Sequence, residues 1–398
     1  MTMELRRRRG HSSNHSQITC ASWLPVPTSS ADESKLIVLG KAESKTDGTT
    51  GILQLALYNF KTDEFGSKGA EEEGGGEEGG PVCIAAHPGG DGVVVSFSKC
   101  CKYFELDDLK SKLKVSDKVL SPLLGVGPQK CLTFSVDGCK LAAGGEDGHL
   151  RVFEWPSMQL LLDEPKAQSS FKDLDFSLDS AFLASTSNAG PARVWDITKT
   201  VPIATLARDQ GDSIDFCRFS RDGTKPFLFC TVTRGGKSSI AVWNMATWKK
   251  LGQKKFFDKP ISAFGISRNG KFLAIGSIEG DISIIEVQKM QVQHSIKRAH
   301  VGATVRSIEF SCNGRALLSM SDEWAARVNP IQCGADWKDW QIYLVLLTMI
   351  IISAILFYIF FEHSDSFWNF PLGREQPARP PIEAILGDPV SPDDQNVW

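Results

Sequence analysis

The chain is rich in side chains that can perform chemistry, but their spacing matches no catalytic or metal-binding pattern. Its ten cysteines include no Cys-x-x-Cys pair, and the sequence holds no His-Glu-x-x-His and no Gly-x-Ser-x-Gly motif. Gly236-Lys237-Ser238 has the ending of a phosphate-binding loop, but Thr231 stands where that motif requires its first glycine. We therefore expect no catalytic residues, no metal site and no cofactor, and we predict that the protein is not an enzyme.

Length and charge narrow the class of protein further. The 398 residues exceed the usual size of one hydrophobic core, which favours either one large repeat fold or two units. Lys and Arg number 44 against 47 Asp and Glu, so the net charge is −3 and a nucleic-acid partner is not expected. The ten cysteines, with no secretory leader ahead of them, are typical of reduced thiols in the cytosol.

A repeated phrase indicates the elements that organise most of the chain. Each copy begins with an apolar residue, followed by Ser, any residue, Asp or Asn, and usually Gly. Two apolar strands separated by a turn come next. Clear copies recur at intervals of 42, 43, 47 and 44 residues, beginning at Phe134, Phe176, Phe219, Ile266 and Phe310. This period is close to the ~40–45 residues of a four-stranded propeller blade. Fainter copies around residues 84–106 and 18–60 bring the total to seven.

Details of the copies fit blades of the WD type. Asp-Gly and Asn-Gly pairs such as Asp137-Gly138 favour tight hairpin turns. Val194-Trp195-Asp196 has the WD strand ending, and we interpret His300 as a structural blade histidine. Scattered carboxylates such as Asp173 and Asp175 are expected on blade surfaces. The sequence therefore predicts an all-β fold, a seven-bladed WD-type β-propeller over residues 16–335.

Two segments are expected to stand outside the regular blades. Residues 1–15 carry the run Arg6 to Arg9 and are predicted to form a flexible basic N-terminus. Residues 68–80 consist mainly of Glu and Gly, with almost no apolar side chain to bury, so we predict a disordered insertion there.

A single transmembrane α-helix is predicted after the propeller. Residues 342–361 contain no charge, no Gly and no Pro, and as a helix they would span about 30 Å, the thickness of a bilayer core. Ile342 and Phe361 bound this anchor, and Tyr343 and Tyr358 lie near its ends, where aromatic rings favour the membrane interface.

The orientation follows from what surrounds the anchor. A large domain without a signal peptide precedes it, so we expect the propeller to stay in the cytosol. Residues 362–398 carry two basic and seven acidic side chains and are predicted to form a short lumenal tail.

This arrangement of propeller and single anchor resembles a known family. It is similar to the endoplasmic-reticulum (ER) exchange factors that load GTP onto the small Sar-family GTPase and so initiate COPII coat assembly. The resemblance extends from Ile18 to about Phe361. Within the family, the chain is similar to the plant branch of phosphate transporter traffic facilitators, including RRRRG near its start and NVW at its end.

The resemblance also implies a functional loop, between the first two strands of blade one. Family members there have four glycines, a Ser-Lys-Thr-like stretch and an Asn-Gly pair; the glycines surround a potassium ion and the Asn reaches into the GTPase. The corresponding residues 39–52 keep part of this pattern, namely Gly40, Ser44, Lys45, Thr46, Gly51 and Ile52. Lys41 and Glu43 interrupt the glycine run, and Thr50 stands in place of the Asn.

These departures predict a degenerate exchange-factor loop. Side chains with a Cβ disfavour the positive φ angles of a tight loop, and Thr50 lacks the amide that donates and accepts hydrogen bonds together. We expect a non-catalytic, ER-resident relative that promotes ER exit and plasma-membrane trafficking of phosphate transporters, its cargo. An active exchange factor for the Sar-type GTPase, with COPII components as partners, and an ER-tethered WD-repeat scaffold are the alternatives.

Overall fold

The structure is a computed structural model that describes residues 3–4, 16–25, 34–45, 48–62, 64–73, 79–107, 112–188, 190–323, 325–331 and 339–363. The chain divides into two compact units, Met1–Gln332 and Cys333–Trp398, which are described separately below.

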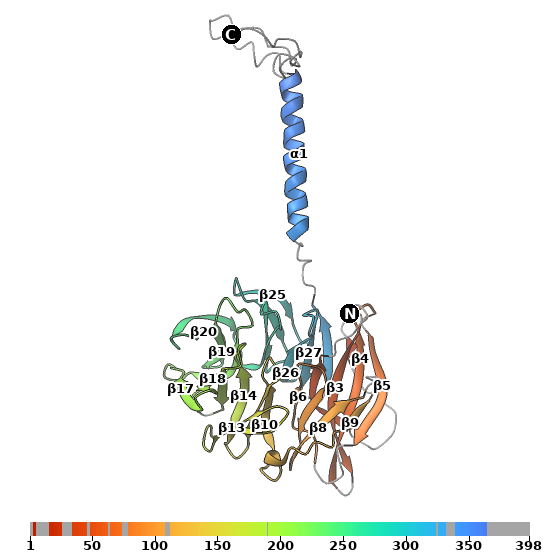
Figure 1. The fold of residues 1–398 in the computed structure, drawn as a ribbon, viewed down its shortest axis with the longest axis vertical. Coiled ribbons are helices and arrows are strands. Elements are labelled where there is room, and N and C mark those ends of the chain that lie inside the picture. Colours follow the sequence, from red (N-terminus) through yellow and green to blue (C-terminus); the bar gives the residue numbers. More distant parts are fainter. Residues whose placement is uncertain are drawn as a thin grey trace, which may run out of the picture. The chain divides into compact units, whose positions relative to one another are not determined.

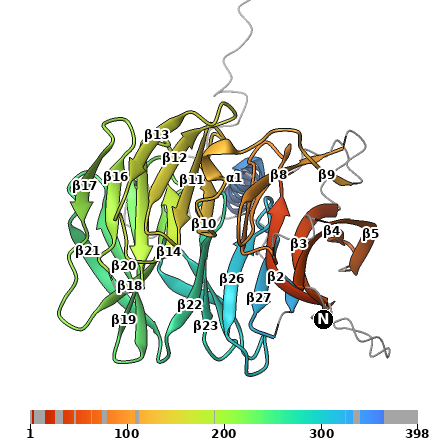
Figure 2. The same ribbon diagram turned by 90° about the horizontal axis from the view of Figure 1, so that it is seen from below.

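The first unit is a seven-bladed β-propeller, as predicted. Seven four-stranded antiparallel sheets are gathered around a common axis (Figures 1 and 2). Blade 1 contains β2 (Ser16–Leu24), β3 (Ser34–Lys45), β4 (Gly48–Asn59) and β5 (Glu64–Glu73). Blade 2 contains β6 (Cys83–Ala86), β7 (Gly92–Ser96), β8 (Cys101–Leu106) and β9 (Leu113–Val115), followed by the 3-10 helix η1 (Ser121–Leu123). Blade 3 contains β10 (Gln129–Phe134), β11 (Lys140–Gly145), β12 (Leu150–Glu154) and β13 (Leu160–Glu164).

The next three blades repeat this order. Blade 4 contains β14 (Phe171–Phe176), β15 (Phe182–Ser187), β16 (Arg193–Asp196) and β17 (Val201–Thr205). Blade 5 contains β18 (Ser213–Phe219), β19 (Phe227–Arg234), β20 (Lys237–Asn244) and β21 (Lys250–Phe257). Blade 6 contains β22 (Ile261–Ile266), β23 (Phe272–Ser277), β24 (Ile282–Glu286) and β25 (Gln291–Ile296).

Blade 7 is completed by the other end of the chain. It contains β26 (Val305–Phe310), β27 (Ala316–Ser321), β28 (Ala326–Pro330) and β1 (Met3–Glu4). Met3 pairs with Val328 and Glu4 with Arg327. The expectation of a flexible terminus over residues 1–15 is therefore wrong for these two residues. The backbone edge of β28 needs a hydrogen-bonding partner, and the N-terminal strand supplies it.

The Glu/Gly insertion also differs from its prediction. Residues 68–80 were expected to be disordered, but β5 continues through Glu73, which pairs with Ile52. The long β4 strand offers an edge of backbone donors and acceptors, and backbone pairing does not require apolar side chains. Residues 74–78 lie outside the described residues.

Apolar layers between the blades hold the ring together. In the described residues, each of seven buried clusters joins two neighbouring blades, and one of them joins blade 7 to blade 1. Trp195 and Trp243, from the WD-type strand endings, are almost completely buried. Gly138 and Gly270 adopt positive φ in the predicted turns, whereas Gly223 does not, since its turn is longer. Propeller stability thus depends on packing between blades.

The two ends of the propeller are distinguished by its turns. The exit face carries the turns between the first and second strands of each blade and between the third and fourth. The chain leaves here after β28, where the Ile331 N–H donates to the Arg315 carbonyl at 2.7 Å. The hairpin face is the opposite end, where β3 and β4 meet.

The second unit contains α1 (Asp339–His363). Within it, Tyr343–Phe360 is long and apolar enough to cross a membrane, and none of that stretch is buried inside the structure. Tyr343 and Tyr358 are exposed. Ile342 and Phe361 lie in the same helix, and Thr348 Oγ donates back to the Val345 carbonyl at 2.8 Å. The prediction of one apolar helix after the propeller is confirmed for the described residues.

Candidate functional site: the β3–β4 hairpin and the axial pocket

The segment expected to form an exchange-factor loop is an antiparallel hairpin. Pairing between β3 and β4 continues without interruption from Ser34 with Asn59 to Lys45 with Gly48. The hairpin joins the second and third strands of blade 1, so the expected position between the first two strands is wrong. The exchange-factor residues fall on its two arms: Gly40, Lys41, Ser44 and Lys45 on β3, and Thr50 and Gly51 on β4. Thr46 lies outside the described residues.

Close packing explains the two glycines of the hairpin. A Cβ added at Gly40 would lie 2.5 Å from Cys20 Sγ and 3.0 Å from Pro81 Cγ. One added at Gly51 would lie 2.8 Å from both the Gly79 carbonyl oxygen and Phe97 Cε1. Both glycines belong to the described residues, and neither adopts a positive φ angle. Their role is to let the hairpin pack against the start of blade 2, and the sequence pattern alone gave no sign of it.

Further contacts fix the base of the hairpin. Thr19 Oγ donates to the Gly40 carbonyl at 3.3 Å, and burial raises the pKa of the neighbouring Cys20 thiol to about 12. A Cβ at Gly80 would lie 2.8 Å from Ala42 Cβ. The thiol therefore stays protonated and acts as a packing group.

Thr50 occupies the position where the exchange factors have an asparagine. It pairs with Glu43 across the hairpin. Its Oγ is buried and has no hydrogen-bond partner in the part of the chain that the structure describes. A short, β-branched hydroxyl held in a strand cannot present an amide to a partner.

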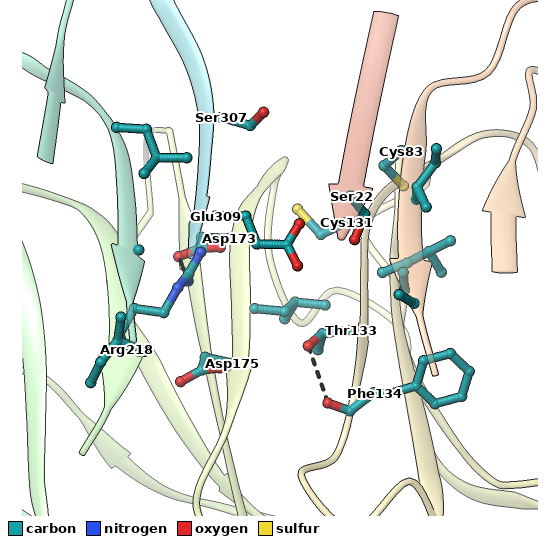
Figure 3. A pocket seen from close by; sticks show the side chains of 18 of the residues that line it. Ser22, Cys83, Cys131, Thr133, Phe134, Asp173, Asp175, Arg218, Ser307 and Glu309 are labelled. Atoms are coloured by element: carbon teal, nitrogen blue, oxygen red, sulfur yellow. Dashed lines mark hydrogen bonds and ion pairs between the residues drawn. The ribbon is translucent and has the colours of Figure 1, made fainter. Parts of the chain in front are cut away.

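A second candidate site is a pocket of about 500 Å³ on the propeller axis, lined by the innermost strands of all seven blades (Figure 3). Its volume lies within the range of ~300–1,000 Å³ found for small-molecule sites. Figure 3 shows Cys131 and Ser22 on one side of it and Arg218 on the other, with Glu309 between them.

Two ion pairs cross from blade 4 to blade 5 in this pocket. Arg218 binds Asp173, whose Oδ2 also accepts the Cys217 N–H at 3.0 Å. Arg221 Nη2 donates to Asp175 Oδ1 at 2.6 Å. Both carboxylates are buried, so their expected place on a blade surface is wrong.

Glu309 connects the last blade to the first. Its Oε2 accepts the Trp23 N–H at 3.2 Å, while the Trp23 indole N–H donates to the Glu309 carbonyl at 3.2 Å. Desolvation raises the pKa of this carboxyl to about 7.

Two of the buried carboxylates on the axis are neutralised by arginines of the next blade, and Glu309 is hydrogen-bonded to Trp23. No group of three His, Cys, Asp or Glu side chains able to hold a metal occurs in the described residues. His300 is buried and its Nε2 lies 2.9 Å from Ser319 Oγ, in agreement with a structural role. The axial pocket is best explained as a set of inter-blade contacts.

Comparison with known proteins places the chain in a family. The WD domain, G-beta repeat model matches residues 126–154, which span β10 to β12. SEC12-like protein 1 of Arabidopsis thaliana is 41% identical over 402 residues, covering 99% of this chain and 98% of that protein. The chain belongs to the SEC12-like family.

Two further relatives show the range of the family. SEC12-like protein 2 of Arabidopsis thaliana is 38% identical over 64% of this chain and 66% of its own length. The guanine nucleotide-exchange factor SEC12 of Rattus norvegicus is 22% identical over 76% of this chain and 77% of its own length. The similarity to a protein named as an exchange factor is thus weaker than the similarity to SEC12-like protein 1.

Proposed function

We propose that this SEC12-like protein is an ER-resident, single-pass membrane protein that promotes the ER exit of phosphate transporters without exchanging nucleotide. The observation that carries the non-catalytic part is the continuous pairing of β3 and β4 across the exchange-factor residues. Membership of the SEC12-like family and the apolar helix Tyr343–Phe360 support the ER membrane location.

The hairpin argues against exchange for two reasons. A glycine-rich loop binds an ion through backbone carbonyls that are free to turn inward, whereas carbonyls in a strand ladder are engaged in pairing. Thr50 also lacks the amide of the exchange factors, and losing one hydrogen bond to a buried partner costs about 1–3 kcal/mol. Such a loss slows a reaction by roughly tenfold to a hundredfold.

The choice of phosphate transporters as cargo rests on the resemblance to the facilitator branch. A propeller presents rings of turns at two faces, which suits binding of the short cytosolic loops and tails of a polytopic protein. In this proposal the propeller is cytosolic and residues 362–398 are lumenal.

The cargo proposal is tested by removing the protein from cells. Phosphate transporters should accumulate in the ER while unrelated plasma-membrane proteins reach the surface. Re-expression of the full chain should restore surface transporter, measured by surface biotinylation. Equal retention of all cargo would favour an active exchange factor, and normal transport of all cargo would favour a scaffold with other partners.

The non-catalytic proposal is tested by nucleotide release. The full chain in liposomes, incubated with the Sar-type GTPase carrying fluorescent GDP, should leave the release rate at its intrinsic value. A SEC12 exchange factor in matched liposomes serves as the positive control, and acceleration by this chain approaching that control would contradict the proposal.

A further inference from the structure

Positive charge gathers on one sector of the exit face. The exit-face turns of blades 5–7 span residues 220–226, 245–249, 267–271, 287–290 and 311–315. They contain a single acidic residue, Asp222, and seven basic ones: Arg221, Lys225, Lys249, Arg268, Lys271, Lys289 and Arg315. Lys250 follows directly at the start of β21. We call these eight basic residues the basic sector.

The remaining turns do not share this charge. On the hairpin face, the connections of blades 5–7 hold three basic and five acidic residues. On the exit face, the described residues in the turns of blades 1–4 include three basic and four acidic ones. The basic sector is therefore a local property of three blades and does not reflect the net charge of −3.

Most of these cations are available to a partner. Lys225, Lys249, Lys250, Arg268 and Arg315 are exposed, and among the described residues no ion pair involves them. On the hairpin face, by contrast, Lys259 binds Glu279 and Asp281, and Arg306 binds Asp322. Arg221 binds Asp175 and Lys289 binds Glu286, so the uncompensated positive charge of the sector comes from the five exposed cations named above.

The chain leaves the propeller inside this sector. Ile331 is hydrogen-bonded to Arg315, and only residues 332–338 separate it from the first residue of α1, Asp339. Even a fully extended chain of that length spans at most about 30 Å. A short tether to a membrane helix gives a weak surface site a high effective concentration of headgroups.

We propose that the basic sector binds the headgroups of anionic phospholipids in the bilayer that holds α1. Clusters of Lys and Arg beside a membrane helix are attracted to anionic lipid over about one Debye length, ~8–10 Å at physiological salt. This binding does not depend on the cargo or on nucleotide exchange.

Amine labelling of the full chain in nanodiscs tests the proposal. Discs of phosphatidylcholine alone are compared with discs that also contain phosphatidylinositol, and modified lysines are quantified by mass spectrometry. Lys225, Lys249 and Lys250 should be labelled several-fold more slowly in the anionic discs, and high salt should remove the difference. Lys297 on the hairpin face is the internal control and should be labelled equally in both.

Two charge-reversal variants sharpen the test. Lys249→Glu/Lys250→Glu should restore fast labelling of Lys225 in anionic discs, because loss of each cation weakens binding by about fivefold. Lys237→Glu/Lys297→Glu makes the same change in net charge on the hairpin face and should leave the protection of Lys225 intact. Equal labelling in the two kinds of disc would overturn the proposal and favour an acidic protein segment as the occupant. An equal effect of both variants would also overturn the proposal, because the net charge of the protein and not the basic sector would then explain the protection of Lys225.

Discussion

Glycine at two positions of the β3–β4 hairpin is required by the space around it. Gly40 and Gly51 fitted the exchange-factor pattern, and the sequence could not reveal that Cys20, Pro81 and Phe97 leave no room for a Cβ. Cys20 lies in β2, whereas Pro81 precedes β6 and Phe97 follows β7, so the approach of the last two depends on the packing of blade 1 against blade 2.

Enlarging either glycine is expected to destabilise the propeller. Gly51→Val should lower the free energy of unfolding by about 1–3 kcal/mol, because the Gly79 backbone and the Phe97 ring must move. Denaturant unfolding of the full chain in detergent measures the loss. Gly252→Val is the matched control, since no atom lies within 4 Å of a Cβ added there. An equal effect of the two substitutions would contradict the packing role.

Glu309 gives the fold a specific dependence on pH. Its pKa is about 7 in the folded protein and 4.5 as the ordinary value, so the folded state binds the proton more tightly. The stabilising contribution of this carboxyl to the free energy of unfolding is fully present below pH 4.5 and is lost as the pH rises through about 7. Glu309→Gln should therefore raise the Tm at pH 8 and have less effect at pH 5.

Thermal unfolding of the two proteins across this pH range provides the measurement. The glutamine is neutral at every pH and can still accept the Trp23 N–H, so the ring closure is retained. Glu323→Gln, at an exposed site, should change the profile little. A Tm for Glu309→Gln that lies below the wild-type value at pH 8 would contradict the assignment.

At the scale of the elements, ion pairs join neighbouring blades. Asp173→Asn should leave the Arg218 guanidinium without its carboxylate in the axial pocket and cost about 3 kcal/mol of stability. Asp322→Asn removes an exposed pair with Arg306 and should cost less than about 1 kcal/mol. Equal losses, measured by denaturant unfolding, would show that the pocket pair contributes no more than a surface pair.

Blade 7 departs from the other WD-type blades at one buried position. Asn329 stands where blades 4 and 5 have Trp195 and Trp243, and it is almost completely buried. Neither polar atom of its side chain has a hydrogen-bond partner within the described ranges. Asn329→Leu should therefore stabilise the propeller by about 1–2 kcal/mol, seen as a higher midpoint of denaturation. A lower midpoint would indicate a polar partner for this amide.

Sequence periodicity was sufficient to predict the blades, but it did not predict the strand pairings that join distant parts of the chain. Turn glycines and alternating apolar strands are local signals, and they predicted the seven blades and the apolar helix. The pairing of Met3–Glu4 with β28 joins residues more than 300 positions apart, so no local sequence pattern predicts it. Likewise the prediction of disorder over residues 68–80 is wrong for the part of β5 that it covers, residues 68–73, since the pairing of β5 comes from the edge of β4.

At the scale of the whole molecule, the function depends on whether blade 1 still acts on a GTPase. The fold and the membership of the SEC12-like family were accessible from the repeat and the anchor. The backbone conformation of the exchange-factor residues could not be predicted in this way, because the family pattern implied a loop where the structure has a paired hairpin.

The rate of GDP release from the Sar-type GTPase is the first quantity to measure, because it shows whether blade 1 promotes nucleotide exchange. With the full chain in liposomes, we expect the intrinsic rate of release, both for the natural sequence and for Thr50→Asn, since the hairpin pairing remains in either case. Release accelerated to a rate near that of a SEC12 exchange factor would show that the proposed non-catalytic role is wrong and that this protein is an exchange factor with a hairpin in place of the loop.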